Sequence, residues 1–268
     1  LLALVLCSTP LFAHDFEVDG VYYKILNSTN KTLEVTYQGS SYSSYSNEYA
    51  GEVDVPSTVA YNGATYTVVS IGSSAFRDCI TLTSVTIPEG VTAINSYAFS
   101  GCVCLTSVTI PESVTSIGQY AFNGCTGLSE VTIPGVTSID NYAFAACSGV
   151  KNAAIGDSIT SIGAYAFSGC TGLTSITIPE STTSIGNKAF ENCTAMTTVN
   201  FNAKDCSMGS SDHPVFTNCT HISTINIGEN VEVIPAYAFK GCSKLTSITI
   251  PDSVTSIGYY AFDSCSSL

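Results

Sequence analysis

The chain is short of charge, and of positive charge above all. Only 11% of its 268 residues are charged, and 21 Asp and Glu stand against 8 Lys and Arg, for a formal net charge of −13. A surface with so few cations repels the phosphates of nucleic acids and anionic lipid headgroups, which argues against both as partners. Serine, threonine, asparagine, glycine and tyrosine must cover most of the surface instead.

Long apolar runs are scarce as well. The opening LLALVLCSTPLFA is the exception, and it is too short to cross a bilayer as a helix. An apolar run followed by Pro10 and Ala13 is typical of the end of a secretory signal, so residues 1–13 are predicted to be a residual signal segment. A buried strand is the alternative interpretation. Cys7 suggests lipid attachment, against which the bulky Leu6 argues. No membrane span is predicted elsewhere.

One motif is abundant, and it recurs along most of the chain. LTSVTIPESVTSIGQYAFNGC, beginning at Leu105, returns almost unchanged at Leu173 and Leu245. A Phe marks each copy and a Cys follows it by three residues, with successive Phe spaced 22, 23 or, once, 26 residues apart. The Phe are Phe76, Phe99, Phe122, Phe144, Phe167, Phe190, Phe216, Phe239 and Phe262, and the Cys are Cys79, Cys102, Cys125, Cys147, Cys170, Cys193, Cys219, Cys242 and Cys265. Such a period indicates a stacked repeat architecture.

Within one repeat the pattern predicts two short strands and a turn. Alternating Val108 and Ile110 with β-branched neighbours indicate a strand, which Pro111 ends because proline has no N–H for a ladder. A second short extended piece carries Val114 and Ile117, and the following GQYAFNGC is predicted to form a single helical turn. A single repeat cannot bury enough apolar surface to fold alone, so neighbouring repeats must share one core.

Stacking also decides how the cysteines are interpreted. Equivalent side chains on adjacent repeats lie about 4.8 Å apart and parallel, whereas a disulfide needs converging Cβ atoms about 3.8 Å apart. The nine repeat cysteines are therefore predicted to form a file of buried free thiols that act as small apolar fillers. Cys102 and Cys104 form a C-x-C pair without a second Cys or His cluster nearby, so no zinc site is predicted. Cys206 lies in an insertion and could be exposed there. The redox states of Cys7, Cys104 and Cys206 stay open.

The two ends of the chain differ from the repeats. Residues 14–68 are predicted to form an N-terminal β cap, in which a disguised first rung carries Asn62-Gly63, a hairpin turn signal. Residues 69–268 are predicted to hold about nine repeats. The absence of an initial Met and the abrupt end at Leu268 predict a fragment of a longer protein.

The repeat L-x-x-I-x-I-P-x-x-V-x-x-I-G-x-x-A-F-x-x-C resembles the BspA-like leucine-rich repeats of bacterial surface proteins. The resemblance covers residues 69–268, with departures at 134–139, 150–163 and 196–216. It implies a repeat solenoid of the leucine-rich-repeat type, a curved array with a parallel β-sheet on its concave face and short helical turns opposite. It also implies a secreted or cell-surface protein, in some relatives one that binds host matrix proteins, other bacteria or epithelial cells. The family has no shared catalytic residues.

Candidate binding residues are those that point outward from the stacked strands. They form hydroxyl, amide and acidic columns that suit an extracellular protein or glycan, although threonine is also a good strand former and acids also keep an array soluble. The candidates are Ser107, Thr109, Glu112, Glu130, Thr132, Ser175, Thr177, Glu180, Asn200, Asn226, Glu229, Thr249 and Asp252. Calcium is not expected, because single-acid columns lack clustered oxygens.

A tyrosine column lies two residues before the repeat Phe. It consists of Tyr97, Tyr120, Tyr142, Tyr165, Tyr237 and Tyr260. The rings could contact a sugar or a protein, or could simply pack rung on rung with their hydroxyls in water.

The repeats supply no convergent set of titratable groups, so no catalytic residue, metal or cofactor is predicted. Cys206 and His213 are the one nucleophile–base candidate, and a polar loop is the plainer interpretation. The sequence thus predicts a secreted or surface-anchored monomer that binds an extracellular protein or glycan. A structural spacer that holds a missing C-terminal domain away from the cell is the alternative.

Overall fold

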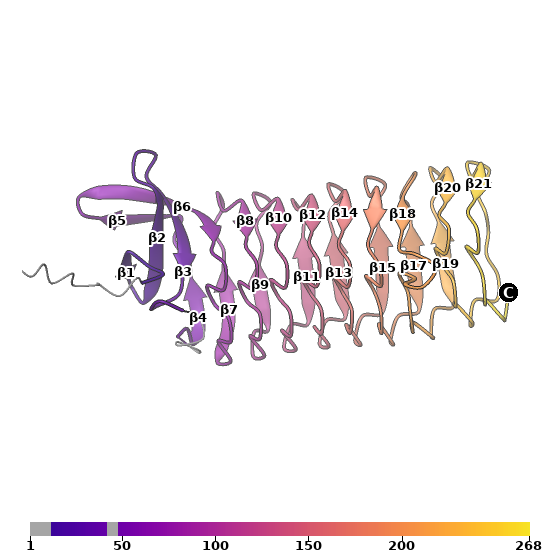
Figure 1. Ribbon diagram of the computed structural model, residues 1–268, viewed down its shortest axis with the longest axis horizontal. Helices are drawn as coiled ribbons and strands as arrows, with labels where there is room; N and C mark the ends of the chain where they lie inside the picture. Colours follow the sequence, from indigo (N-terminus) through magenta and orange to yellow (C-terminus); the bar gives the residue numbers. More distant parts are fainter. Residues whose placement is uncertain (1–11, 42–47) are drawn as a thin grey trace, which may run out of the picture.

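The structure, a computed structural model, describes residues 12–41 and 48–268. Figure 1 shows the repeats stacked as successive rungs along one axis. The rungs carry a longer strand from the V-x-I segment and, in a second row, a two-residue strand from the S-I segment, except that the last rung, at 245–268, has the second strand alone. Most of the predicted signal segment, including Cys7, lies outside the described residues.

The longer strands form the sheets that we call the long-strand face. They are β4 (Gly51–Asp54), β7 (Leu82–Thr86), β9 (Ser107–Thr109), β11 (Glu130–Ile133), β13 (Asn152–Ile155), β15 (Ser175–Ile178), β17 (Thr198–Phe201) and β19 (Thr224–Ile227). The strands pair in parallel within two sheets, β4 to β9 and β11 to β19. From β15 to β19 they are in register, so that Thr177 faces Asn200 and Asn200 faces Asn226. Equivalent residues of successive repeats therefore lie above one another, and the predicted repeat solenoid is confirmed.

The second row is the short-strand face. Its strands are β8 (Ala93–Ile94), β10 (Ser116–Ile117), β12 (Ser138–Ile139), β14 (Ser161–Ile162), β16 (Ser184–Ile185), β18 (Ser207–Met208), β20 (Val233–Ile234) and β21 (Ser256–Ile257). The strands from β8 to β18 form one continuous parallel sheet that extends the sheet of the N-terminal cap.

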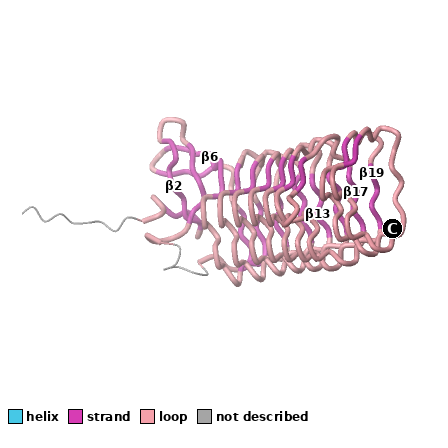
Figure 2. The backbone as a smooth tube through the Cα atoms, turned by 45° about the vertical axis from the view of Figure 1, so that its right-hand side comes forward, coloured by secondary structure: helices cyan, strands magenta, loops and turns pink. Residues whose placement is uncertain are grey.

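The predicted helical turns are wrong: Figure 2 shows strands and loops, and no helix occurs in the described residues. In the A-F segment alternate N–H groups have different partners. Those of Ala98 and Ser100 donate three residues back within the turn, whereas those of Phe99 and Gly101 donate to carbonyls of the next rung. A helix would direct each N–H four residues back along its own chain. In the stacked rungs, half of these N–H groups instead donate to the neighbouring rung. The remaining N–H groups close overlapping β-turns within the rung.

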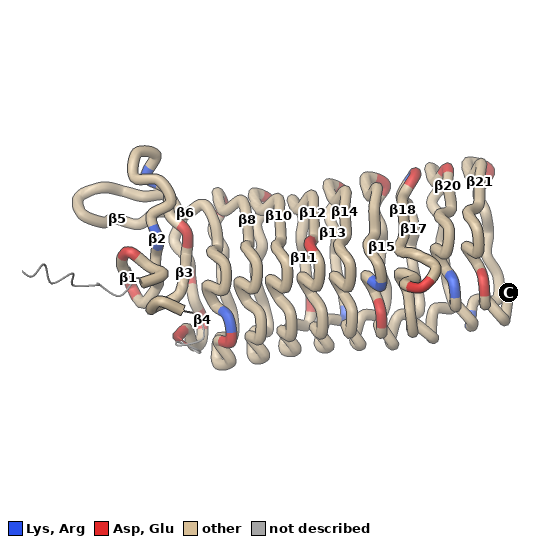
Figure 3. Tube along the Cα trace, in the orientation of Figure 1, with Lys and Arg blue, Asp and Glu red and all other residues tan. Residues whose placement is uncertain are grey.

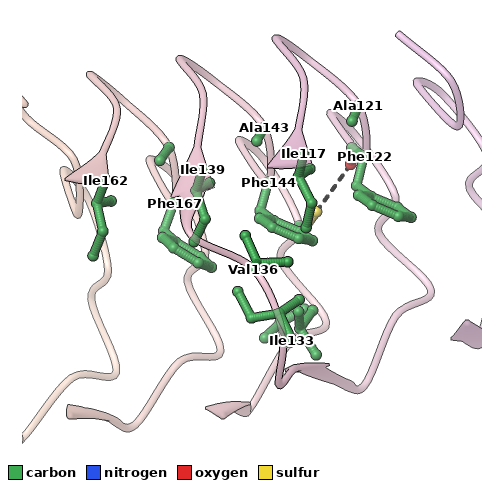
Figure 4. Close-up of a cluster of buried hydrophobic side chains, with 14 of the residues drawn as sticks. Ile117, Ala121, Phe122, Ile133, Val136, Ile139, Ala143, Phe144, Ile162 and Phe167 are labelled. Atoms are coloured by element: carbon green, nitrogen blue, oxygen red, sulfur yellow. Dashed lines mark hydrogen bonds between the residues drawn. The ribbon is translucent and has the colours of Figure 1, made fainter. Parts of the chain in front are cut away.

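A file of phenylalanine rings runs through the core (Figure 4). The ring centroids of Phe122 and Phe144 lie 5.0 Å apart with an interplanar angle of 1°. The spacing grows to 6.2 Å between Phe216 and Phe239, beyond the insertion. Because all of these rings except the last, Phe262, are almost fully buried and stacked, each repeat packs on its neighbours rather than on itself.

The nine repeat cysteines form the predicted file of free, buried thiols. Seven of these thiols also have a specific partner that packing alone does not predict. The Cys125 thiol donates to the carbonyl oxygen of Phe99 on the preceding rung at 3.0 Å, and the Cys147 thiol to that of Phe122 at 3.1 Å (Figure 4). Burial raises the pKa of Cys125 and of Cys170 to about 12. The thiols therefore stay protonated and act as hydrogen-bond donors inside an apolar core.

The first rung is closed by the N-terminal segment. An antiparallel set of β1 (Phe16–Val18), β2 (Val21–Asn27) and β3 (Thr32–Thr36) meets β6 (Ala64–Ile71), which pairs in parallel with β3.

The structure forms a hairpin at Asn62-Gly63 and a rung from the segments on either side of it. β5 (Thr58–Tyr61) pairs antiparallel with β6 across Asn62 and Gly63, both at positive φ, while β4 and β6 pair with the next rung. The Phe16 ring stacks 3.8 Å from that of Tyr61, and the Tyr49 ring lies 4.5 Å from Phe76. Tyr49 thus covers the first ring of the phenylalanine file.

We predict that the thiols differ sharply in reactivity. Ten of the eleven described cysteines are buried and only Cys104 is exposed. A thiol-reactive dye should label Cys104 in the folded protein and the buried ten only after denaturation, because the thiolate is the reactive form. Labelling stoichiometry by mass spectrometry checks this, with Cys104→Ser as the matched control. Rapid labelling of Cys147 in the folded protein would contradict it.

The cap should become less stable as pH rises. Burial raises the pKa of Glu48 to about 6 from its ordinary 4.5, although its carboxylate accepts the Gln38 N–H at 2.8 Å. The folded state holds this proton more tightly than the unfolded chain, so stability is lost as pH rises from 4.5 through 6. The Glu48→Gln variant lacks this titration, so between pH 4.5 and 6 its unfolding free energy should rise relative to that of the parent protein. We expect a relative gain of about 1 kcal/mol, after allowance for the partial exposure of Glu48. Denaturant unfolding at each pH measures it, and exposed Glu52→Gln should show no such trend.

Candidate functional site

The residues predicted to bind a partner lie together on the long-strand face and just beyond the ends of its strands. All are exposed except Ser175 and Asn200, which are half-buried. Parallel in-register pairing places Glu130 beside Asn152 and Thr132 beside Ala154. The alternation of the strands thus turns one set of side chains into the core and this set into solvent.

Side chains on this face are joined from rung to rung. The Asn226 amide donates to Asn200 Oδ1 at 2.7 Å, and the Asn200 amide donates to Thr177 Oγ1 at 3.1 Å. These bonds fix the orientation of two amides on three adjacent strands. The polar groups are therefore pre-organised, which lowers the entropic cost of engaging a partner.

Two hollows lie at the C-terminal end of this face. The larger, of about 540 Å³, is lined by Glu180, Glu229, Asp157, Asn202 and Asn230 among others. Asn230 donates to Glu180 Oε2 at 3.3 Å across two rungs. The smaller, of about 300 Å³, shares Glu229 and includes two further candidates, Asn226 and Thr249.

The larger hollow is acidic and the smaller one shares its Glu229, whereas Figure 3 shows much of the coil uncharged. Their carboxylates do not converge on one point: over residues 12–41 and 48–268, no group of three or more Asp, Glu, His or Cys side chains could hold a metal ion. Carboxylates and amides lining an open hollow can accept hydrogen bonds and attract a cationic group.

The tyrosine column lies on the turn side of each rung. Tyr97, Tyr120, Tyr142 and Tyr165 form a continuous stack with centroids 4.7 to 4.9 Å apart. The Arg77 guanidinium lies 5.0 Å from the ring centroid of Tyr97, and the Lys188 ammonium lies 5.9 Å from that of Tyr165. Since each inner ring face covers the next, these rings offer edges and hydroxyls to a partner rather than open faces.

Every tyrosine of the column has positive φ, between 56° and 60°. A bulky residue in this region is strained by roughly 1–2 kcal/mol. The position two residues before it, filled by Gly118 or Pro235, is not at positive φ. Ring stacking compensates for the strain. Lys188, which occupies the tyrosine position of its rung, has the same backbone conformation, with φ at 53°.

The insertion at 196–216 does not assemble the Cys/His pair considered from the sequence. The exposure considered for Cys206 does not occur: the residue is 3% exposed, and its thiol donates to the Ser207 carbonyl at 3.3 Å. Burial raises the pKa of Cys206 to about 12, which makes it a poor nucleophile. His213 lies on the exposed part, with Nδ1 3.3 Å from the Ser210 hydroxyl. The chain buries Cys206 because the adjacent Met208 continues the core position of the short strands.

A third hollow, larger than these two, lies where no candidate was predicted. A groove of about 810 Å³ runs along the short-strand face from β8 to β18 and is lined by Ser116, Ser138, Ser161 and Ser184 with the residues that follow them. The serine that recurs in the T-S-I-G segments indicates a row of hydroxyls on this face, but the sequence does not show that the face is hollowed.

No helix within the described part of the chain has the length and apolarity needed to cross a bilayer.

We predict that stacking, rather than the hydroxyl, makes Tyr142 stabilising. Tyr142→Ala removes two ring contacts worth about 0.5–1.5 kcal/mol each, so unfolding free energy should fall by about 1–3 kcal/mol. Tyr142→Phe keeps both contacts and should be nearly neutral. Thermal and denaturant unfolding of the two variants measure the difference, and equal losses would show that the hydroxyl carries the effect.

Comparisons with known proteins place these features in a family. A family model described as a BspA type leucine rich repeat region, in six copies, matches residues 57–151 and 137–268. No curated protein matches the chain.

Several solved structures are similar. A leucine-rich repeat protein from Bacteroides ovatus is 28% identical, with 95% of this chain and 81% of that chain covered and a TM-score of 0.45. The T. pallidum leucine rich repeat protein is 21% identical, with 86% and 90% covered and a TM-score of 0.53. A leucine rich cell surface protein from Faecalibacterium prausnitzii is 24% identical, with 97% and 88% covered and a TM-score of 0.44. The T. pallidum structure supports the fold. With its family model matched over more than half of its length, the chain belongs to the BspA-type leucine-rich repeat family.

Proposed function

We propose that this chain is a secreted or cell-surface binding protein that presents its long-strand face to extracellular proteins or glycans. Membership of a family of repeat-built interaction and surface proteins supports this, as does the resemblance of residues 1–13 to the end of a secretory signal. We further propose that it acts as a single chain, without catalytic chemistry, metal or cofactor.

The observation that carries the proposal is the alignment of exposed polar side chains across successive rungs. Buried positions are filled by the phenylalanine, cysteine and aliphatic files, which pack the scaffold. Outward positions on the long-strand face vary from rung to rung among serine, threonine, asparagine and glutamate. A face that is regular in geometry and varied in chemistry suits recognition of another surface.

The acidic hollows favour one kind of partner. Glu180, Glu229 and Asp157 border one depression, and the whole chain carries a net charge of −13. A basic segment of an extracellular protein would be attracted over several ångströms and could pair with these carboxylates. Such binding would weaken as salt rises, because the charges on an open hollow are screened.

The hollows are poorly suited to catalysis. Their titratable residues, among those the structure describes, are carboxylates only, without a histidine, cysteine or lysine to act as a nucleophile or a second acid–base group. Recognition is therefore the activity that this surface supports best.

The test is binding of the whole chain to a panel of matrix proteins and immobilised glycans. The double variant Glu180→Lys, Glu229→Lys should weaken binding to a basic partner by about tenfold or more, since two attractions become repulsions. Asp205→Lys with Asp212→Lys changes the net charge equally on the exposed insertion and should have little effect. Interferometry at two salt concentrations measures both.

Absence of binding to every member of the panel would contradict the proposal and favour a structural spacer. Equal losses in the two double variants would show that net charge, rather than the hollow, governs association.

A further inference from the structure

The groove on the short-strand face crosses six successive rungs. Strands β8, β10, β12, β14, β16 and β18 form its floor, and the residues immediately after each strand form one side. Figure 1 shows these strands as one row, distinct from the row of longer strands. The groove therefore runs along the solenoid axis and lies apart from the acidic hollows.

Two adjacent hydroxyl columns on this floor behave differently. Each threonine of the T-S-I-G segments donates to the preceding rung, as Thr160 does to the Thr137 carbonyl at 3.0 Å and Thr183 to the Thr160 carbonyl at 3.0 Å. The serines beside them, at 116, 138, 161 and 184, are half-buried, and their hydroxyls have no partner among the described residues. The scaffold thus uses the threonine column and, at the end of the serine column, Ser207, whose hydroxyl donates to the Thr183 carbonyl at 3.4 Å. The four serines from 116 to 184 remain available to a ligand.

The lining is almost free of charge. Serine, glycine, isoleucine and asparagine dominate it, and Asp140 is its one ionisable residue. The amides of Asn95, Asn141 and Asn187 stand along the side of the groove. Hydroxyls and amides that both donate and accept suit a neutral ligand rich in hydroxyl groups.

The glycines of the lining have a structural reason that does not involve a ligand. A Cβ at Gly163 would lie 2.6 Å from the Asn141 backbone nitrogen, and one at Gly186 would lie 2.4 Å from that of Ala164. Close approach of the rungs therefore requires glycine here. The free serine hydroxyls have no such explanation, since alanine, which occurs at position 93, fits the same slot.

The spacing of the rungs selects the polymer. Phenylalanine centroids on the rungs beneath the groove are 5.0 to 5.3 Å apart. An extended peptide advances by about 3.3 Å per residue and a polyproline helix by about 3.1 Å, so neither keeps step with the hydroxyls. A β-1,4-linked hexopyranose chain advances by about one rung per sugar. Alternate sugars are turned over, so the hydroxyls that meet successive rungs come alternately from opposite edges of the sugar ring.

We propose that the groove binds a neutral, linear, β-1,4-linked polysaccharide laid along the solenoid axis, one sugar to a rung. Serine hydroxyls on the floor and asparagine amides on the side bond to successive sugar hydroxyls. The site is separate from the acidic hollows and does not depend on their having a partner.

Length dependence is the first test. Cello- and manno-oligosaccharides of two to eight units are titrated into the whole chain by calorimetry. Affinity for at least one series should rise by roughly two- to tenfold per added sugar, the effect of one net hydrogen bond, and level off near six units. Maltohexaose has the same length but α-linkages that coil it, and should bind far more weakly. No binding at millimolar concentration, no length dependence, or equal binding of maltohexaose would overturn the proposal.

A pair of variants on one rung locates the site. Ser184→Tyr fills the groove floor, whereas Thr177→Tyr adds the same bulk to the long-strand face; tyrosine is accepted in exposed strands. The first should abolish hexasaccharide binding, and the second should leave it unchanged. The triple variant Ser138→Ala, Ser161→Ala, Ser184→Ala keeps the shape and should weaken binding about tenfold or more.

Thermal unfolding of each variant establishes that it is folded. Loss of sugar binding in Thr177→Tyr but not in Ser184→Tyr would move the site to the long-strand face and overturn the proposal. Displacement of the hexasaccharide by an extended uncharged peptide of equal or higher affinity would overturn it in favour of a peptide groove. Binding of matrix proteins, tested separately with the Glu180 and Glu229 variants, does not affect either outcome.

Discussion

Backbone hydrogen bonding between rungs is the constraint on which the rest of the structure depends. A rung holds too few residues to satisfy its own donors and acceptors, so its N–H groups must reach the carbonyls of a neighbour in both strands and in the turns. Neighbours can meet that demand only if their backbones superimpose. The nearly constant 23-residue period, the in-register strands and the strained tyrosines are all consequences of this superposition.

Side chains complete what the backbone leaves unfinished. The Cys125 thiol caps a buried Phe99 carbonyl, and Thr160 caps the exposed Thr137 carbonyl one rung back. Both residue types can donate a hydrogen bond without carrying charge. This explains the composition: the chain is poor in charge because many of its surface hydroxyls are already committed to the scaffold, where a charged side chain could not replace them without placing like charges one rung apart.

The sequence was sufficient for the architecture because architecture is what the repeat encodes. The Phe and Cys files, the two strands per rung and the Asn62-Gly63 hairpin follow from period, alternation and turn chemistry. The turn was misassigned because A-F-x-x-C has the spacing of a helical turn, and because Tyr142 is a residue type that local propensity would never place at positive φ. Its conformation is decided by the next rung, which no local pattern contains.

The candidate site was less predictable for a related reason. Outward residues can be listed from alternation, and the long-strand candidates do lie outward. Whether a hydroxyl is free or committed depends on the distance to a carbonyl one rung away, so Ser161 and Thr160 look alike in the sequence and differ in the structure. Cys206 is likewise buried because it lies two residues before the buried Met208, although the residues around it are typical of a polar loop.

The two faces are consequently suited to recognise different kinds of ligand. From β10 to β16 the short-strand face repeats a serine and an isoleucine on every rung, and such a regular surface is best matched by a ligand of regular repeat, which is a uniform polymer. The long-strand face keeps the geometry but changes its side chains, with glutamate at 130, asparagine at 200 and 226 and threonine at 249. A surface that is irregular in chemistry can discriminate among irregular partners, which are proteins or branched glycans. One scaffold requirement, that rungs superimpose, thus permits both kinds of recognition on a single coil, provided that the variation is confined to side chains that no neighbouring rung needs.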